Sequence, residues 1–508
     1  MLSRVLLPIL LLFCCAFFAV STPAQTISTA VCPANSKLIC TLPEVYGPNG
    51  LQQGIGPLRP GAEPPGTTHH GGHFESDFIS SLGPLNAAVG SQLTLLPLGS
   101  PGSGLVYIYD PTLKTFTAST EDLGPILTER ANTTGRHKVR VGFTYQRFSF
   151  STLDGTSLHS LPATFKHISD PAGDFTNGIM TTSACDPANN ASNMGLCGFV
   201  RDRIDTVTNI NLHLNQYTAS ATFGLTSRID VSLAVPIINV GMSVSSVATI
   251  INNSNTTDHQ FDPAKVPSCS ATPCLQGTFA NSSSATGIGD VVLRAKGVVW
   301  SGERAAVALG ADLRFPTGDE QNFLGSGTFG FTPFAVFSYS ARVSPHANVG
   351  FEENGNSVLA GNIIGPTSTA PSTLTKGHLP NQFLYSGGVD VVIVKTRLAG
   401  TFDLIGQRVL NARRSTVTTQ SFLGACGPTG LVPVDSSNSN GYCTAPDANV
   451  SQPALTETKG SFNIINASLG AKVRVSDKLV IFGNALIKLD DGGLRAKVVP
   501  LVGASFSF

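Results

Sequence analysis

The sequence predicts an all-β chain that forms an antiparallel transmembrane β-barrel of about twelve strands, preceded by an irregular N-terminal segment. Three observations support this: segments that alternate apolar and polar residues, connections that alternate in length, and a charged fraction of only 13%. A membrane barrel carries a lipid-facing apolar band where a soluble protein carries charge, and it needs no long apolar runs. A secreted soluble all-β protein is the alternative, and the low charge disfavours it.

Residues 1–24 have the features of a secretory signal peptide. Arg4 precedes an apolar run over 5–20, and small residues follow at Thr22-Pro23-Ala24. An uncleaved anchor is disfavoured because the run is short and leads into a polar stretch rich in Pro and Gly. After the signal, no run approaches eighteen apolar residues, so the sequence predicts no transmembrane helix.

Strand-like alternation begins at residue 138 and continues to the C-terminus. The candidate strands are 138–150, 207–223, 229–244, 287–300, 305–316, 329–340, 346–353, 383–394, 398–410, 461–475, 479–489 and 494–508. Their even number suits a bacterial barrel, in which both chain ends finish on the periplasmic side. A barrel of fourteen strands would keep this parity and stays open.

The connections sort into two kinds along the chain. Five are tight and alternate with mostly long segments rich in Ser, Thr, Asn, Gly and Pro. The tight ones are 226–228, 301–304, 341–345, 395–397 and 476–478, and the others are 151–206, 247–286, 317–328, 354–382, 411–460 and 490–493. Short turns on one side and long loops on the other are the layout of outer-membrane barrels. We therefore expect a bacterial outer membrane as the location and its lipid as a partner.

The last strand ends on an aromatic residue. Every second residue from Leu494 to Phe508 is apolar, and the opposite face carries Arg495, Lys497, Ser505 and Ser507. A terminal Phe on such a strand is typical of the closing strand of outer-membrane barrels. We expect Phe508 to be the signal that the barrel-assembly machinery reads.

The N-terminal segment, residues 25–137, has a different character. Residues 51–72 are rich in Gly and Pro and predict irregular structure, 92–98 predicts a strand, and 105–117 predicts a hairpin turning at Asp110-Pro111. A plug inside the barrel, a periplasmic extension and an additional strand pair are the three interpretations.

Eight cysteines remain after signal removal, and they lie in close pairs outside the predicted strands. Disulfides that staple loops explain this pattern in an oxidising compartment, whereas zinc would need closer spacing and histidine partners. The expected pairs are Cys32/Cys40, Cys185/Cys197, Cys269/Cys274 and Cys426/Cys443.

Alternation also predicts which side chains face the lumen, because a charge on the lipid face costs about 2–4 kcal/mol near the bilayer centre. The charged and polar candidates are Asp290, Arg294, Lys296, Asp312, Arg314, His346, Asn348, Glu352, Asp390, Asp403, Lys472, Arg474, Lys488, Arg495 and Lys497. The apolar candidates are Phe334, Val336, Phe482, Leu486, Val499 and Leu501. Such a lumen is mixed: charge pairs brace the wall, and apolar patches either fill space or line a route for a solute of low polarity.

Four stretches resemble the outer-membrane family named for the phenol meta-cleavage degradation pathway. They are TFGLTSRIDVSLAVPI (222–237), TGIGDVVLRAKGVVW (286–300), ALGADLRFPTGDEQNFLGSG (308–327) and HANVGFE (346–352). The resemblance covers the central third of the chain and implies a channel for aromatic or other hydrophobic compounds. The motif residues are Gly224, Arg228, Gly289, Asp290, Pro316, Gly318 and Asp319, which we interpret first as turn and strand-end geometry.

Other site types find little support. His69, His70 and His73 form the one histidine cluster, but a flexible glycine-rich tether explains it better than a metal site. His213 and His346 lack a neighbouring nucleophile signature, and we expect neither an enzyme nor a cofactor. The net charge of zero gives no reason to expect nucleic-acid binding. Two functional classes remain: a channel for small hydrophobic or aromatic solutes, and a structural or surface-interaction barrel whose disulfide-stapled loops do the work.

Overall fold

A computed structural model describes most of the region from residue 127 to the C-terminus and parts of the N-terminal segment. The described residues are 29–30, 37–46, 53–55, 72–97, 107–110, 115–118, 127–166, 202–253, 259–263, 266, 268–269, 273–364, 373–395, 397–424, 431–435, 438–443 and 449–508. The predicted signal peptide lies outside them. Among these residues, no helix is both long and apolar enough to span a bilayer.

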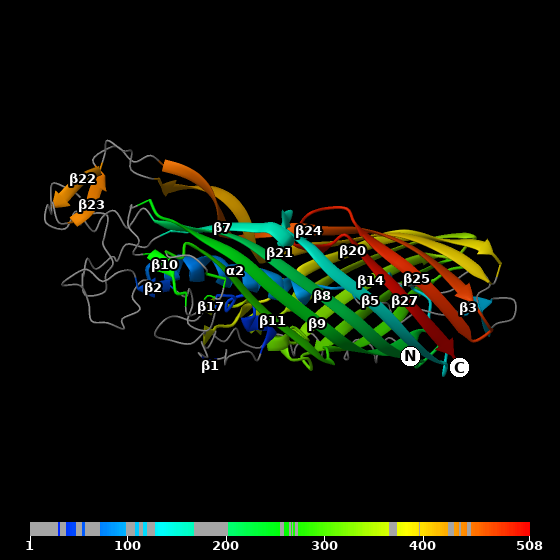
Figure 1. Cartoon of the computed structure of the whole chain (residues 1–508). Helices are drawn as coiled ribbons and strands as arrows, with labels where there is room; N and C mark the ends of the chain where they lie inside the picture. The colour runs from blue at the N-terminus through cyan, green and yellow to red at the C-terminus, as the bar shows by residue number, and fades with distance from the viewer. Residues whose placement is uncertain are drawn as a thin grey trace.

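Twelve antiparallel strands close into a barrel (Figure 1). Each strand pairs with the next along the chain, and the last pairs with the first, from Leu501↔Gln146 to Ser507↔Arg140. In chain order they are β5 (Val139–Leu153), β8 (Arg203–Gly224), β9 (Ile229–Ile251), β12 (Val291–Ser301), β13 (Ala305–Phe315), β14 (Gly330–Tyr339), β15 (Val343–Asn354), β20 (Gln382–Val394), β21 (Leu398–Leu423), β24 (Asn449–Arg474), β25 (Leu479–Lys488) and β27 (Val498–Ser507). The twelve-strand prediction is confirmed, and fourteen is not adopted.

Several strands are longer than the alternation predicts. β8, β9, β21 and β24 contain 22, 23, 26 and 26 residues, whereas about 9–11 residues cross a membrane. The predicted loops 247–286 and 411–460 were therefore partly wrong, since their flanks continue the barrel. The extensions of β21 and β24 are polar on both faces, as in Arg413–Thr419, so hydrophobic alternation gives no signal there. The barrel thus has a short-turn end, which carries the five tight turns, and a long-loop end.

The wall is irregular beside the fourth strand. β11 (Gln276–Ile288) pairs with the long-loop half of β9, and β12 pairs with the short-turn half. The two strands therefore follow one line along β9, which is interrupted at Gly289 and Asp290. On its other edge, β12 pairs with β13, whereas β11 has no second partner among the described strands. The loop that follows β13 lies against this interruption: a Cβ on Gly289 would come within 3.1 Å of the Leu324 carbonyl oxygen.

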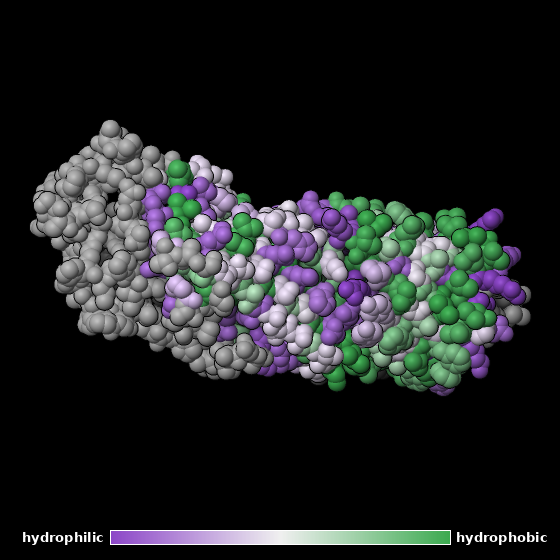
Figure 2. Space-filling model, viewed as in Figure 1, coloured by the Kyte–Doolittle hydropathy of each residue, from purple (hydrophilic) through white to green (hydrophobic). Residues whose placement is uncertain are grey.

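The outer surface changes character along the barrel axis. Apolar residues gather on the wall near the short-turn end, at the right of Figure 2, and polar residues dominate toward the long-loop end. The exposed apolar side chains there include Phe143, Phe223, Leu309, Phe337, Phe402, Leu469 and Val502. Tyr145, Asn215, Asn239 and Thr286 form a chain of outward hydrogen bonds across β5, β8, β9 and β11. This row of hydrogen bonds lies between the apolar band and the polar part of the wall toward the long-loop end.

The N-terminal segment contributes a helix that the sequence analysis missed. α2 (Gly72–Leu93) packs against the inner faces of β21 and β24 in the long-loop half, with Leu85 and Val89 buried (Figure 1). The predicted strand at 92–98 was wrong, because Gln92 and Leu93 complete this helix. The predicted hairpin is confirmed as β3 (Tyr107–Asp110) paired with β4 (Thr115–Ala118). Within the predicted irregular stretch 51–72, β2 (Gln53–Ile55) pairs with β10 (His259–Phe261).

Two cysteine predictions fall on described side chains. Cys269 and Cys274 form a disulfide, as predicted, and Cys40 is also disulfide-bonded. The remaining predicted partners, Cys32, Cys185, Cys197, Cys426 and the Cys443 side chain, lie outside the described residues, as do His69 and His70.

Candidate functional site

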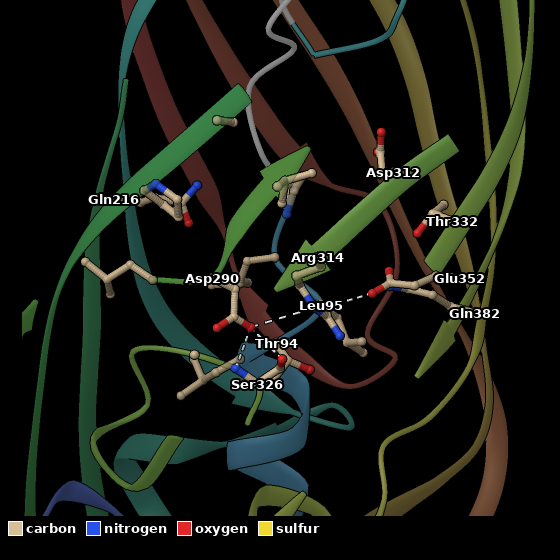
Figure 3. Close-up of a pocket in the computed structure, with 18 of the residues that line it drawn as sticks. Thr94, Leu95, Gln216, Asp290, Asp312, Arg314, Ser326, Thr332, Glu352 and Gln382 are labelled. Carbon is tan, nitrogen blue, oxygen red and sulfur yellow. Dashed lines mark hydrogen bonds and ion pairs between the residues drawn. The ribbon is translucent and has the colours of Figure 1, made fainter. Parts of the chain in front are cut away.

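A cavity of about 240 Å³ lies inside the barrel, between the end of α2 and the inner wall (Figure 3). Leu93 to Pro97 form one boundary, and Leu127 lies at another. The remaining lining comes from eight wall strands, the loop after β13 and Leu359 in the short helix η7 (Val358–Ala360). The lining wall and loop residues are Gln216, Ser232, Ala234, Pro236, Ile238, Asp290, Val292, Arg294, Asp312, Arg314, Phe323, Leu324, Gly325, Ser326, Thr332, Glu352, Leu359, Gln382, Leu384 and Gln407. The cavity is therefore built jointly by the barrel and the N-terminal segment.

One part of this lining is apolar. Leu93, Leu95, Leu96 and Pro97 come from α2 and the residues that follow it, while Ile238 and Leu324 come from the wall and the loop. Leu93 and Leu95 are nearly inaccessible to solvent. An apolar ligand that enters this part of the cavity would gain about 25 cal/mol for each Å² of apolar surface, its own included, that leaves water.

The other part carries ion pairs between neighbouring strands. Arg294 on β12 holds Asp312 on β13 through two bonds of 2.6 and 2.7 Å. Arg314 on β13 donates to Glu352 on β15 at 2.6 Å, and Gln382 on β20 donates to the second oxygen of Glu352 (Figure 3). These residues alternate with lipid-facing ones along their strands, and this alternation brings four predicted lumen charges, on β12, β13 and β15, into two ion pairs.

Asp290 holds the loop that follows β13 inside the barrel. Its carboxylate accepts hydrogen bonds from the backbone N–H groups of Gly318 at 3.1 Å and Ser326 at 2.7 Å. A Cβ on Gly325 would come within 2.3 Å of the Asp290 Oδ1, so only glycine fits there. The two resemblance motifs that contain Asp290 and Pro316-Thr317-Gly318-Asp319 therefore meet in space.

The other motif residues occupy turn and loop positions. The Asp319 carboxylate accepts from Lys37 at 2.8 Å and from the Gln321 and Asn322 nitrogens. The Gly224 carbonyl accepts from the His137 N–H, and the Arg228 carbonyl accepts from the Val298 N–H on β12. Each of these contacts shapes the backbone.

Residues 127–134, which we call the strap, cross the lumen near the short-turn end. Glu129 accepts from Arg294 at 2.7 Å and from Lys296 at 3.0 Å, and the Arg130 Nε donates to Asp390 at 3.1 Å. Lys472 also donates to Asp390, at 3.2 Å. The Ala131 N–H donates to Ser338, and the Thr134 N–H donates to Asp230. The strap is thus bound to the wall on several sides by groups that are mostly buried.

His346 takes part in a further contact with the strap. Its Nε2 lies 3.2 Å from the Thr128 hydroxyl and also contacts Asp403, which in turn accepts from Thr128 at 3.2 Å. A catalytic triad needs the hydroxyl and the carboxylate on opposite ring nitrogens. Here both partners share one nitrogen, so this group has a binding geometry and not that of a nucleophile with its base.

The remaining predicted lumen residues lie in several environments. Phe482 and Leu501 are buried and pack together with Leu127, whereas the half-buried Phe334 ring lies under the Arg294 guanidinium at 5.0 Å. Val336, Leu486 and Val499 are buried, and Arg495 is buried beside Asp490. Asn348 and Arg474 are half-buried, Lys488 bonds the exposed Asp491, and Lys497 is exposed instead of inward.

The sequence analysis missed two strap residues, Glu129 and Arg130, and the helix α2. Glu129 and Arg130 lie in a segment without alternation, so the sequence pattern did not predict that they lie in the lumen. α2 does have a signal: Phe74, Leu82, Leu85, Val89 and Leu93 keep helical spacing and are all buried. Gly83 and Pro84 in the middle of the segment hid that spacing, because both residues disfavour a helix interior.

A closed twelve-strand barrel with an apolar outer band is an outer-membrane β-barrel, and this chain is one. Residues 205–389 match the family model described as "Putative MetA-pathway of phenol degradation", which confirms the resemblance carried by the motifs. No curated protein matches the chain.

Solved structures with similarity to this chain include three outer-membrane proteins. An outer-membrane channel from Pseudomonas putida F1 has 9% identity and a TM-score of 0.34, covering 73% of this chain and 96% of its own. A FadL homologue from Pseudomonas aeruginosa has 8% identity and a TM-score of 0.25, with 73% and 88% covered. The toluene transporter TbuX from Ralstonia pickettii has 10% identity and a TM-score of 0.25, with 74% and 90% covered.

Proposed function

We propose that this protein is a channel for the uptake of small hydrophobic or aromatic compounds across the outer membrane. The observation that carries the proposal is the cavity between α2 and the wall, which combines an apolar lining with ion pairs that satisfy each other. Protein sites for small molecules have this composition: mostly apolar, with a few placed polar groups.

The strap and α2 close the route in this state. The strap binds the wall through Glu129 and Arg130, and α2 fills the long-loop half above the cavity. A solute that enters the cavity therefore needs the N-terminal segment to move before it reaches the periplasm. We propose that residues 25–137 act as the gate of the channel.

Uptake into liposomes tests this function. A variant that keeps the signal peptide but lacks residues 26–130 should admit small neutral aromatics faster than the full chain, and charged solutes of similar size should gain less. Heat-modifiable migration establishes that the shortened barrel has assembled. If the assembled variant admits nothing, the channel function fails and a surface-interaction barrel takes its place, with the disulfide-stapled long-loop end as its working part.

A further inference from the structure

We propose that the cationic side chains of the five short turns bind the phosphate headgroups of anionic phospholipids in the leaflet beside them. We call these side chains the rim. The inference concerns the contact between the barrel and its surrounding lipid, so it goes beyond the proposed channel function and does not depend on it.

The rim has an excess of positive charge. Each of the five turns carries at least one cation, and only two carboxylates, those of Glu303 and Asp477, lie in the same turns. This excess is local, because the whole chain has a net charge of zero. The rim cations, all of them exposed, are Arg228, Arg304, Arg342, Lys395, Arg397 and Lys478.

The rim cations differ from those of the lumen in their pairing. Arg294, Arg314 and Lys472 inside the barrel each lie within 3.2 Å of a carboxylate oxygen. The chain thus neutralises these internal cations and leaves most of the rim to a partner outside itself. Among the residues that the structure describes, no carboxylate forms an ion pair with Arg228, Arg304, Arg342, Arg397 or Lys478.

Apolar side chains of the outer wall lie next to the rim. Trp300, which is 54% exposed, precedes the turn of Arg304, and the exposed Leu225 and Ile229 flank the turn of Arg228. At the short-turn end, hydrophilic residues border the apolar band (Figure 2). Such an apolar band lies in the hydrocarbon, and long Lys and Arg side chains at its edge keep their charge in the headgroup layer. The rim is therefore at the depth of the lipid phosphates. The other turns adjoin the exposed Val343, Val394 and Val475.

The distribution of the rim around the barrel favours lipid over a protein partner. The five turns join β8 to β9, β12 to β13, β14 to β15, β20 to β21 and β24 to β25. The cations are therefore spread around the closed wall and are not gathered on one side of it. Lipid surrounds a barrel on all sides, whereas a docked protein would contact one sector. A ring of charge beside an apolar wall matches a shell of lipid.

The chemistry of the rim favours an anionic headgroup. Four of the six cations are arginines, whose guanidinium group donates two parallel hydrogen bonds to a phosphate. Phosphatidylcholine carries its own cation beside the phosphate, whereas phosphatidylglycerol carries only the negative charge. Lys and Arg at a membrane surface attract lipid of the second kind.

Fluorescence of Trp300 tests the proposal, because this residue adjoins the rim and is the single tryptophan of the chain. The full chain is placed in phosphatidylcholine bilayers that contain the same fraction of either brominated phosphatidylglycerol or brominated phosphatidylcholine. Bromine on an acyl chain quenches an indole that it contacts, so the two series give the relative binding constant of the two lipids. We expect phosphatidylglycerol to be preferred about threefold or more in dilute buffer. The preference should fall toward one in about 1 M salt, where charges are screened within about 3 Å.

Two variants locate the binding on the rim. The turns of Arg228, Arg304 and Arg342 are neighbours near Trp300: the Val298 N–H donates to the Arg228 carbonyl, and the Ser340 N–H donates to the Arg304 carbonyl. Changing all three arginines to glutamine should reduce the preference to less than about 1.5-fold. The matched control combines Arg397→Gln with Lys478→Gln. These residues follow β20 and β24, on other parts of the ring, and the control should keep the preference at Trp300.

Equal quenching by the two brominated lipids in the unaltered protein overturns the proposal and leaves the rim to an acidic protein partner. A preference that salt leaves unchanged also overturns it, as does an equal loss of preference in both variants, since the attraction would then not arise at the neighbouring turns. The unaltered protein decides the matter if a variant fails to assemble. Uptake by the variant lacking residues 26–130 does not depend on these results, so the channel function and this inference fail separately.

Discussion

Asp290 on the barrel wall accepts a hydrogen bond of 2.7 Å from the backbone N–H of Ser326, a residue 36 positions later in the loop that follows β13. The second carboxylate oxygen accepts from Gly318 in the same loop. One wall side chain thus holds both ends of a loop that lines the cavity.

We expect Asp290→Asn to loosen this loop. The new amide places an N–H group against one of the two backbone donors, and an unsatisfied buried group costs about 1–3 kcal/mol. Limited proteolysis should then cut within 317–328, and the midpoint of thermal unfolding should fall. Glu303→Gln, on an exposed short turn, is the matched control and should change neither. Unchanged proteolysis of the Asp290 variant would show that other contacts hold the loop.

The strap gives a sharper test of the gate than a deletion. Arg130→Leu removes the cation that binds Asp390, and both side chains are only 3% exposed. Asp390 keeps Lys472 as a partner, but the strap loses its own buried ion pair with the wall. The closed arrangement should therefore be populated less, and single-channel conductance should rise. Arg136→Leu, six residues further on and exposed, should conduct like the unaltered protein. Equal conductance of the two variants would mean that this pair does not hold the gate closed.

Acid should weaken the contact between the N-terminal segment and the loop after β13. Burial alone would raise the pKa of Asp319, but the bonds from Lys37 and Asn322 outweigh it and hold that pKa below the usual range. A depressed folded-state pKa stabilises the contact above the unfolded value, near 4, and this stabilisation is lost as the pH falls through the folded value. Hydrogen exchange at the Leu38 amide, which donates to Asn322, should therefore accelerate below about pH 4. Asp319→Asn should abolish this acceleration. An unchanged pH response in that variant would assign it to another group.

The C-terminal residue closes the seam between the last and first strands. The Phe508 N–H donates to the Val139 carbonyl at 2.9 Å, while its ring is 64% exposed and lies 4.7 Å from Phe506. Deletion of Phe508 should impair assembly in the membrane but leave secretion intact, as measured by heat-modifiable migration. Phe383→Ala removes an exposed aromatic elsewhere and should assemble normally. Normal abundance of the Phe508 deletion would count against an assembly signal.

Labelling of single cysteines on whole cells tests the orientation of the barrel in the membrane. Single cysteines introduced at positions 302 and 436 stand on a short turn and in the long connection between β21 and β24. We expect a membrane-impermeant thiol reagent on whole cells to label position 436 and to spare position 302, because long loops face outward in barrels of this kind. The opposite pattern would invert the topology.

The barrel and the order of its strands could be predicted from the sequence, because side chains along each strand alternate between its two environments. Val139 to Tyr145 and Val498 to Phe508 show this period clearly, and all twelve segments became strands. The same period predicts that Arg294, Asp312 and Glu352 all face the lumen.

How far the strands extend and what fills the barrel depend on contacts that form only in the folded chain. The upper halves of β21 and β24 have polar residues on both faces, so backbone pairing and not side-chain pattern defines them. Glu129 and Arg130 enter the lumen because Arg294, Lys296 and Asp390 bind them there, from positions more than 160 residues away in the chain. The cavity exists for the same reason: Leu95 and Gln407 meet only when a helix from the N-terminal segment lies inside a wall built by the rest of the chain. Such contacts depend on the closed fold, and no local pattern in the sequence encodes them.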